Sequence, residues 1–325
     1  MKIIDWAIIF VLLATPVLWI LQLHTGDVRE GHRLQVRYTT ALHVAVQDAA
    51  SALNLNELQQ YETGYGSVKY MRTDKDQALS AFIQTLSINF GIVDDYLSQG
   101  TMMAYIPAIV IIEYDGYSAY AVDLSAEGSN MSKFSHRWRP KKPYVYMDEY
   151  GNSIAFTLDD AITAYESSTG QWYRGKMDEL QQETNIPLLQ DARTFDQVRR
   201  FTIINSIQDD LAGYMNRHNE HAMRLGVNYT FTLPTLSQED WLNTLNDVGV
   251  LVFLQGIPVG SSYYNNYAFG GGRVVQNRPL IGGVDDITGL KYQYREMCTQ
   301  RYRGEQIFAN RRDAAAKGYY EIVCP

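Results

Sequence analysis

Residues 106–124, which read IPAIVIIEYDGYSAYAVDL, decide the fold class of this chain. Two runs rich in β-branched and aromatic residues, 106–113 and 117–124, flank Tyr114-Asp115-Gly116. Asp-Gly favours the positive φ of a tight hairpin turn, so the two runs are predicted to pair as antiparallel strands. The runs 144–147 and 153–158, on either side of a turn at 149–152, predict a second hairpin.

Helical periodicity lies on both sides of these hairpins. Upstream, residues 73–90 begin at the capping box Thr73-Asp74-Lys75-Asp76 and carry one apolar stripe. Downstream, residues 194–225 begin at a second capping box and carry apolar residues along one face. Because helices and hairpins alternate without a regular strand–helix repeat, we predict an α+β fold with antiparallel hairpins and packed helices.

The remaining segments complete this prediction. The polar stretch 126–143 predicts an exposed loop, and the Gly- and Tyr-rich stretch 258–272 predicts another. Residues 229–233 predict a strand, Ser237 is expected to cap a short helix, and residues 249–257 predict a buried strand. A subdivision of the domain is possible near residues 170–195.

The N-terminus begins with an apolar run from Trp6 to Leu23. Its roughly 18 residues approach the ~20 that span a bilayer, and the flank lacks a small-x-small cleavage pattern, so we expect an uncleaved anchor at residues 1–25. A cleaved signal peptide is the alternative. Residues 26–60 predict an amphipathic stem helix, which would hold the α+β domain of residues 61–325.

Composition limits the classes of function. The chain has 325 residues, of which 46% are hydrophobic and 20% charged, and this is enough apolar material for a folded core. A net charge of −8, with the basic residues scattered except at 137–142, argues against a nucleic-acid partner. The 24 tyrosines suit wet β-surfaces, protein interfaces or sugar-binding faces equally well.

No recognised catalytic or cofactor-binding motif stands out, so we predict neither catalytic residues nor a cofactor. His218 and His221 lie three apart on a predicted helix, but the zinc-protease spacing is absent and no metal site is predicted. Gly270-Gly271-Gly272-Arg273 lacks the phosphate-loop spacing and is interpreted as a turn or bulge. Adjacent carboxylates such as Asp209 and Asp210 point in different directions and cannot share one proton.

The predicted loop contains the best candidate for a binding surface, Tyr263-Tyr264-Asn265-Asn266-Tyr267. Its aromatic rings can stack on sugars while its amides bond to hydroxyls, although the same tyrosines can also pack on their own domain.

The two cysteines, Cys298 and Cys324, both lie near the C-terminus. A disulfide in an oxidising compartment is the favoured interpretation, with free thiols or half of a zinc site as alternatives.

The first 55 residues resemble the N-terminal arm of TadE-like and type IV pilin-like membrane proteins of bacteria. The resemblance rests on Asp5 at the head of the apolar run, Pro16 within it, and the Ala-rich continuation over residues 38–50. It implies that Asp5 pairs with a neighbouring subunit, since a carboxylate in a bilayer needs a partner. It further implies that the stem, including Tyr38, Leu42, Ala45 and Ala49, packs on partner helices.

Together these observations predict a single-pass cell-membrane protein that acts by assembly with protein partners in a pilus or secretion apparatus. The resemblance implies an extracytoplasmic domain, whereas Arg29, Arg33 and Arg37 beyond the run would by the positive-inside rule place it in the cytoplasm. Two alternatives belong to other classes. One is a tethered module that binds cell-wall glycan, and the other is an anchored hydrolase whose site is assembled from distant carboxylates.

Overall fold

In a computed structural model the chain forms two compact units, residues 1–274 and 275–325. The stretch 170–195 lies inside the first unit. The structure describes residues 3–53, 67, 69–70, 72–93, 95–125, 133–237, 239–241, 245, 247–272, 280–286, 288–295, 302–308, 314–315 and 317–321. The first unit is α+β, with antiparallel sheets and packed helices as predicted.

Helix α1 (Ile3–Ala52) is a single helix of 50 residues, about 75 Å long at 1.5 Å per residue. The predicted continuation of the N-terminal run into a stem helix is therefore confirmed as far as Ala52, and residues 54–60 lie outside the described part. Its last three turns are buried at Ala41, Leu42, Ala45, Val46, Ala49, Ala50 and Ala52. Across the described residues, no helix combines the length and the low polarity that crossing a membrane requires.

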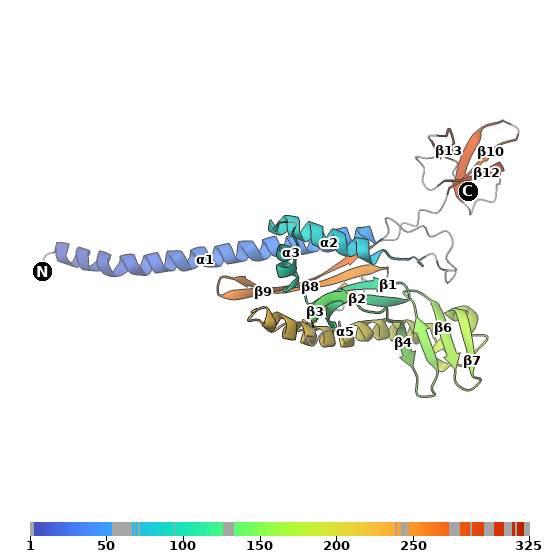
Figure 1. Cartoon of the computed structure of the whole chain (residues 1–325), viewed down its shortest axis with the longest axis horizontal. Coiled ribbons are helices and arrows are strands. Elements are labelled where there is room, and N and C mark those ends of the chain that lie inside the picture. Colours follow the sequence, from blue (N-terminus) through green and yellow to red (C-terminus); the bar gives the residue numbers. More distant parts are fainter. Residues whose placement is uncertain are drawn as a thin grey trace. The chain divides into compact units, whose positions relative to one another are not determined.

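Sheet A has five strands in the order β3-β2-β1-β8-β9. Its strands are β1 (Ala108–Glu113), β2 (Gly116–Ser125), β3 (Lys133–Trp138), β8 (Gly249–Val259) and β9 (Ser262–Gly271). In Figure 1 the sheet lies between α1 and α2 (Lys75–Phe90) on one side and α5 (Ala192–Arg224) on the other. Strands β1 and β8 are buried along almost their whole length, because both faces of the sheet are covered.

The first predicted hairpin is confirmed, with Glu113 paired to Gly116. The reason given for its glycine was wrong, however, since Gly116 is not among the glycines with positive φ. A Cβ at Gly116 would instead collide with the carbonyl oxygen of Lys142, whose backbone bonds to Tyr117 at 2.9 Å. The glycine thus allows a close approach by a segment about 26 residues further along.

Sheet B has the order β4-β5-β6-β7 and contains the second predicted hairpin. Its strands are β4 (Tyr144–Met147), β5 (Ser153–Phe156), β6 (Ala161–Glu166) and β7 (Gln171–Lys176). Strand β7 contacts the short helix α4 (Met177–Leu180), β4 contacts α5, and η2 (Pro187–Gln190) contacts both of these helices. Side chains along β5 alternate between the buried face of the sheet and its solvent face.

The helices begin close to the predicted positions. Asp74 caps α2 by accepting from the Gln77 amide at 2.9 Å, and Asp191 caps α5 by accepting from the Arg193 amide at 3.1 Å. The α5 cap thus precedes the predicted box at residue 194. Helix α3 (Tyr96–Met103) was not predicted, and Asp95 caps it through the amides of residues 97 and 98.

Three predicted loops or strands were wrong. The supposed loop 126–143 contains β3, which pairs with β2, while residues 126–132 lie outside the described part. The supposed loop 258–272 is mostly strand β9, paired with β8 around a short turn at Gly260 and Ser261. Conversely, residues 229–233 form no strand: side-chain amides of Asn219 and Gln255 bond to the backbone of residues 231 and 232.

The second unit contains a four-stranded sheet in the order β12-β10-β11-β13. Its strands are β10 (Leu280–Val284), β11 (Lys291–Arg295), β12 (Arg303–Phe308) and β13 (Tyr320–Glu321). Pairing is antiparallel except between β11 and β13. Within this unit Phe308, Ala314 and Tyr319 form a small buried cluster.

Candidate functional site

A groove of about 590 Å³ lies between β4 and α5 in the first unit. Several apolar side chains on its walls face solvent: Met147 is 68% exposed, Phe201 66% and Val145 44%. The helical side of the groove is a single stripe of residues spaced at three to four positions, consisting of Gln197, Val198, Phe201, Thr202, Asn205, Ser206 and Asp209. Such exposed apolar walls are typical of a surface that binds a partner.

Strand β4 is an edge strand, so one of its sides has no neighbour in sheet B. Its register with β5 is regular, and the Asp148 amide donates to the Asn152 carbonyl at 3.0 Å just beyond the paired residues. Hydrogen-bonded and non-hydrogen-bonded pairs alternate along an antiparallel ladder. The backbone N–H and C=O groups of Val145 and Met147 are therefore directed to the free edge of the sheet.

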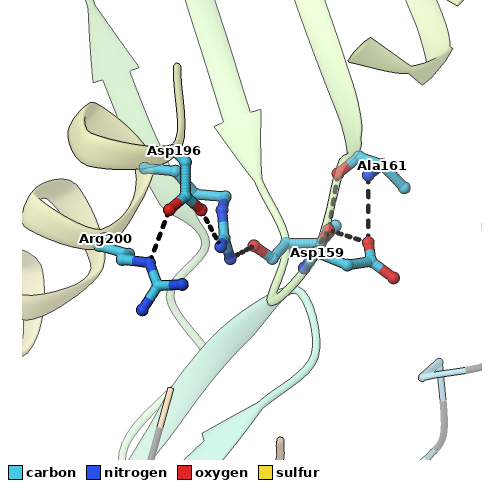
Figure 2. A network of polar contacts seen from close by, with 6 residues as sticks. Asp159, Ala161, Asp196 and Arg200 are labelled. Carbon is cyan, nitrogen blue, oxygen red and sulfur yellow. Dashed lines mark hydrogen bonds and ion pairs between the residues drawn. The ribbon is translucent and has the colours of Figure 1, made fainter. Parts of the chain in front are cut away.

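A polar network fixes the first turns of α5 against sheet B (Figure 2). Asp196 pairs with Arg200 at 2.8 Å and with Arg199 at 2.5 Å. Arg199 is only 6% exposed and also donates to the carbonyl oxygen of Thr157, in the turn between β5 and β6, at 3.2 Å. The helix is thereby held beside the groove at the same turns that contribute Gln197 and Val198.

Asp159 fixes the turn between β5 and β6. This carboxylate accepts from the Ala161 amide at 3.0 Å, from the Tyr114 hydroxyl at 2.6 Å and from Ser67. Burial raises the pKa of Asp159, but these bonds to the charged form outweigh it, so the pKa lies below its usual value. The network therefore connects sheet B to the β1–β2 turn of sheet A.

A second network fixes α5 further along. Asp210 accepts from Lys142 at 2.7 Å and from the Tyr117 hydroxyl at 2.7 Å. Burial raises the pKa of Tyr117 well above its usual value, and the neighbouring Asp210 carboxylate raises it further. The phenol therefore stays protonated and donates its hydrogen bond. The neighbouring Asp209 lies on the groove wall and is its one charged lining residue in the described part of the chain.

The solvent face of sheet B carries a second apolar surface. Met147, Ser153, Tyr165 and Trp172 stand opposite one another in a row across the four strands. Trp172 is 67% exposed, and its ring centroid lies 5.1 Å from that of Tyr165. The exposed Trp172 ring beside Tyr165 offers an apolar face on which a ligand could pack.

The structure places the predicted stem contacts inside the protein's own core. Leu42, Ala45 and Ala49 are at most 1% exposed, and α1 packs against α2, β8 and β9. Tyr38 lies against the rings of Phe90 and Tyr264, at 5.1 and 5.5 Å. Leu42, Ala45 and Ala49 are therefore covered by this chain's own elements, because the small alanines let its sheet approach α1, whereas Tyr38 is partly exposed. The side chain of Asp5 lies outside the described part.

The tyrosine-rich candidate segment is also used within the domain. Tyr264 is 4% exposed and its hydroxyl lies 3.1 Å from the Thr39 hydroxyl, to which Asn266 also donates at 3.3 Å. Asn265 accepts from the Gly256 amide at 3.0 Å, at the bulge in β8. Tyr267 donates to Asp240 at 3.0 Å, and Tyr263, 44% exposed, lies against Tyr229 at 5.1 Å. Of this segment, Tyr263 and Asn265 are exposed and could contact a ligand.

Three histidines meet between α5, β3 and the α3–β1 connection. The ring centroid of His136, a residue that was not selected from the sequence, lies 5.7 Å from that of His218 and 5.9 Å from that of His221. The Nε2 atoms of His136 and His218 lie 3.3 and 2.8 Å from the carbonyl oxygens of Ile106 and Ala104. Burial lowers the pKa of His136 to about 4 and that of His218 to about 3.

These rings do not form a metal centre: within the described ranges, no three His, Cys, Asp or Glu side chains are arranged to hold an ion. Cys298 and Cys324 lie outside the described residues. The groove residues were not selected from the sequence, and only the alternation of Val145 and Met147 in a short strand hinted at them.

Comparison of the chain with family models, curated proteins and solved structures finds no match.

Proposed function

We propose that this protein is a single-pass membrane-anchored component that acts by assembly with other proteins, in the manner of a minor pilin-like or secretion-apparatus subunit. The observation that carries the proposal is the division of α1 into two parts. Large apolar side chains from Phe10 to Trp19 are exposed, whereas one face of the same helix is buried between Ala41 and Ala52. An apolar rod continuous with a folded core suits a body held rigidly on an anchor.

The anchor is tested by fractionating cells that express the full chain. Replacing Leu13 and Leu18 together with lysine is expected to move the protein from the carbonate-resistant membrane pellet to the supernatant, because a lysine near a helix centre opposes insertion by roughly 2.5–3.5 kcal/mol. Val36→Lys is the matched control, since Val36 is an exposed apolar residue of the same helix outside the run. Unchanged pelleting of the double variant contradicts the proposal.

Assembly and orientation have separate tests. If Asp5 contacts a neighbouring subunit, Asp5→Ala is expected to reduce recovery of partners in a pull-down from membranes. Added protease is expected to cleave the domain in intact cells if the domain is extracytoplasmic. Protection in intact cells together with cleavage after lysis would place it in the cytoplasm.

A second candidate function, binding of cell-wall glycan, is favoured by the Trp172–Tyr165 pair on the face of sheet B. Retention of the protein on purified peptidoglycan is expected to fall when Trp172 is replaced with alanine. Tyr150→Ala is the control, because Tyr150 is a 65% exposed aromatic residue in the β4–β5 turn. Equal retention of both variants and the native chain argues against this function.

A further inference from the structure

We propose that the groove between β4 and α5 binds an extended, lysine- or arginine-containing segment of a partner protein, which adds as a fifth strand to the free edge of sheet B. This inference rests on the assembly function proposed above and names the surface through which assembly occurs.

The free edge of β4 provides the backbone part of the site. The N–H and C=O groups of Val145 and Met147 point away from β5, as the ladder alternation requires. Natural edge strands are commonly protected by charged residues or proline, and the edge strands β3 and β7 carry Lys133, Arg137, Arg174 and Lys176, whereas the uncharged edge strand β9 packs on α1. Strand β4 reads YVYM and carries no charge. Its edge is therefore suited to strand addition.

The groove provides the side-chain part of the site. A strand beside β4 presents alternate side chains to the two faces of the sheet, and the groove wall on α5 lies next to that edge. Phe201 leaves a large apolar area exposed on the α5 wall, while Val145 and Met147, which also line the groove, are exposed on the solvent face of the edge strand. The two polar networks around Asp196 and Asp210 fix α5, so the site is formed before binding and little ordering is required of it.

Charge identifies the chemistry of the occupant. Asp209 is the charged member of the lining, and Glu149 is exposed in the turn directly after β4. Among the residues that the structure describes, no lysine, arginine or histidine lines the groove. A basic strand is therefore complementary to the site. A second copy of this chain, with its net charge of −8, would bring the same carboxylates against each other and is disfavoured.

The test uses the full chain in detergent micelles and a random heptapeptide library displayed on phage. Selection is expected to enrich peptides with apolar residues at alternate positions and at least one lysine or arginine. The most enriched peptide is then synthesised with a fluorophore and titrated by fluorescence anisotropy. Replacing alternate residues of this peptide with proline, which has no N–H for the ladder, is expected to abolish binding.

Four variants of the chain locate the site. Phe201→Ser is expected to weaken binding at least tenfold, whereas Met223→Ser, which changes a 75% exposed residue of α5 outside the groove, leaves it unchanged. Val145→Pro removes an outward N–H without breaking a bond to β5 and is also expected to weaken binding at least tenfold. Asp209→Lys is expected to reverse the preference, so that a peptide with glutamate in place of lysine binds better.

Three results overturn the proposal. The first is a selection in which the native chain enriches no peptide more strongly than the Phe201→Ser variant does. The second is peptide binding whose affinity none of the groove variants changes. The third is self-association of the chain that Val145→Pro abolishes, since it assigns the edge to a second copy. If Val145→Pro fails to fold, the exposed positions Phe201 and Asp209 still decide the question. Failure here leaves the membrane-extraction result intact, so the two proposals fail separately.

Discussion

At the scale of single residues, the histidine cluster shows what burial does to an ordinary side chain. His218 is fully buried and its Nδ1 has no hydrogen-bond partner, while its Nε2 meets the carbonyl oxygen of Ala104. Removing the ring from water penalises its charged form, and the two neighbouring rings add to this penalty. His136 and His218 are therefore neutral in the folded protein above about pH 4, and their contacts with the carbonyl oxygens of Ile106 and Ala104 hold β3 and α5 against the α3–β1 connection.

A pH dependence follows from these histidines. Because the pKa of His136 in the folded state, about 4, lies below the usual value near 6.5, the unfolded chain binds the proton first as the pH falls. Stability is expected to be full above pH ~6.5 and to decrease between there and pH 4. Each such histidine contributes a slope of up to about 1.4 kcal/mol per pH unit.

The measurement is urea unfolding of the full chain at several pH values. His136→Gln keeps an N–H that can donate to the carbonyl oxygen of Ile106, but its side chain cannot titrate. The slope of the free energy of unfolding against pH is therefore expected to be smaller in this variant, by at most the contribution of one proton. A comparison at pH 8 separates this effect from a general loss of stability. An identical slope in the variant and the native chain contradicts the prediction.

At the scale of elements, the packing of α1 on sheet A depends on glycines at the end of β9. A Cβ at Gly270 would lie 2.6 Å from the carbonyl oxygen of Val46, and one at Gly272 would lie 2.8 Å from that of Ala50. Real Cβ atoms do not approach oxygen so closely. The glycine run therefore lets a strand lie directly against a helix backbone, and its glycines serve packing within this contact.

A matched pair of substitutions tests this contact. Gly270→Ala is expected to lower the free energy of unfolding by about 1–3 kcal/mol, since the added methyl forces α1 away from β9. Gly271→Ala is the control, because nothing lies within 4 Å of its added Cβ, and we expect its stability to stay within about 1 kcal/mol of the native chain or to rise slightly. Urea midpoints measure both, and equal losses would falsify the packing explanation.

At the scale of the whole molecule, the chain contains two units with separate buried clusters among the described residues. All members of the large cluster precede residue 275, and the small cluster around Phe308 follows it. Among the described strands, each sheet is formed only by strands of the same unit. The two units are therefore expected to unfold independently.

Removal of residues 275–325 tests this independence. The shortened chain is expected to keep the urea midpoint and the near-ultraviolet circular dichroism of the first unit, since its core loses no member. Calorimetry of the full chain supplies the complementary measurement, with two transitions expected. A midpoint lowered by the truncation would show that the first unit depends on the second.

The sequence by itself determined the elements whose signals are local. The hairpins at 106–124 and 144–158, the helices α2 and α5, and the buried strand β8 follow from side-chain period and from capping residues, which act within a few positions. The α+β class follows from their order. The membrane anchor and the assembly function stay predictions that rest on the N-terminal run and on the resemblance of the stem.

Only the tertiary structure decided which surfaces are occupied. An apolar stripe such as Leu42, Ala45 and Ala49 shows that a helix face is buried, but not whether the same chain or a partner covers it. Likewise, the amides of Asn219 and Gln255 replace a strand partner for residues 231–232, and the groove arises where β4, the edge strand of sheet B, lies beside α5. These features depend on contacts between residues far apart in the chain, and the local periodicity of side chains cannot predict such contacts.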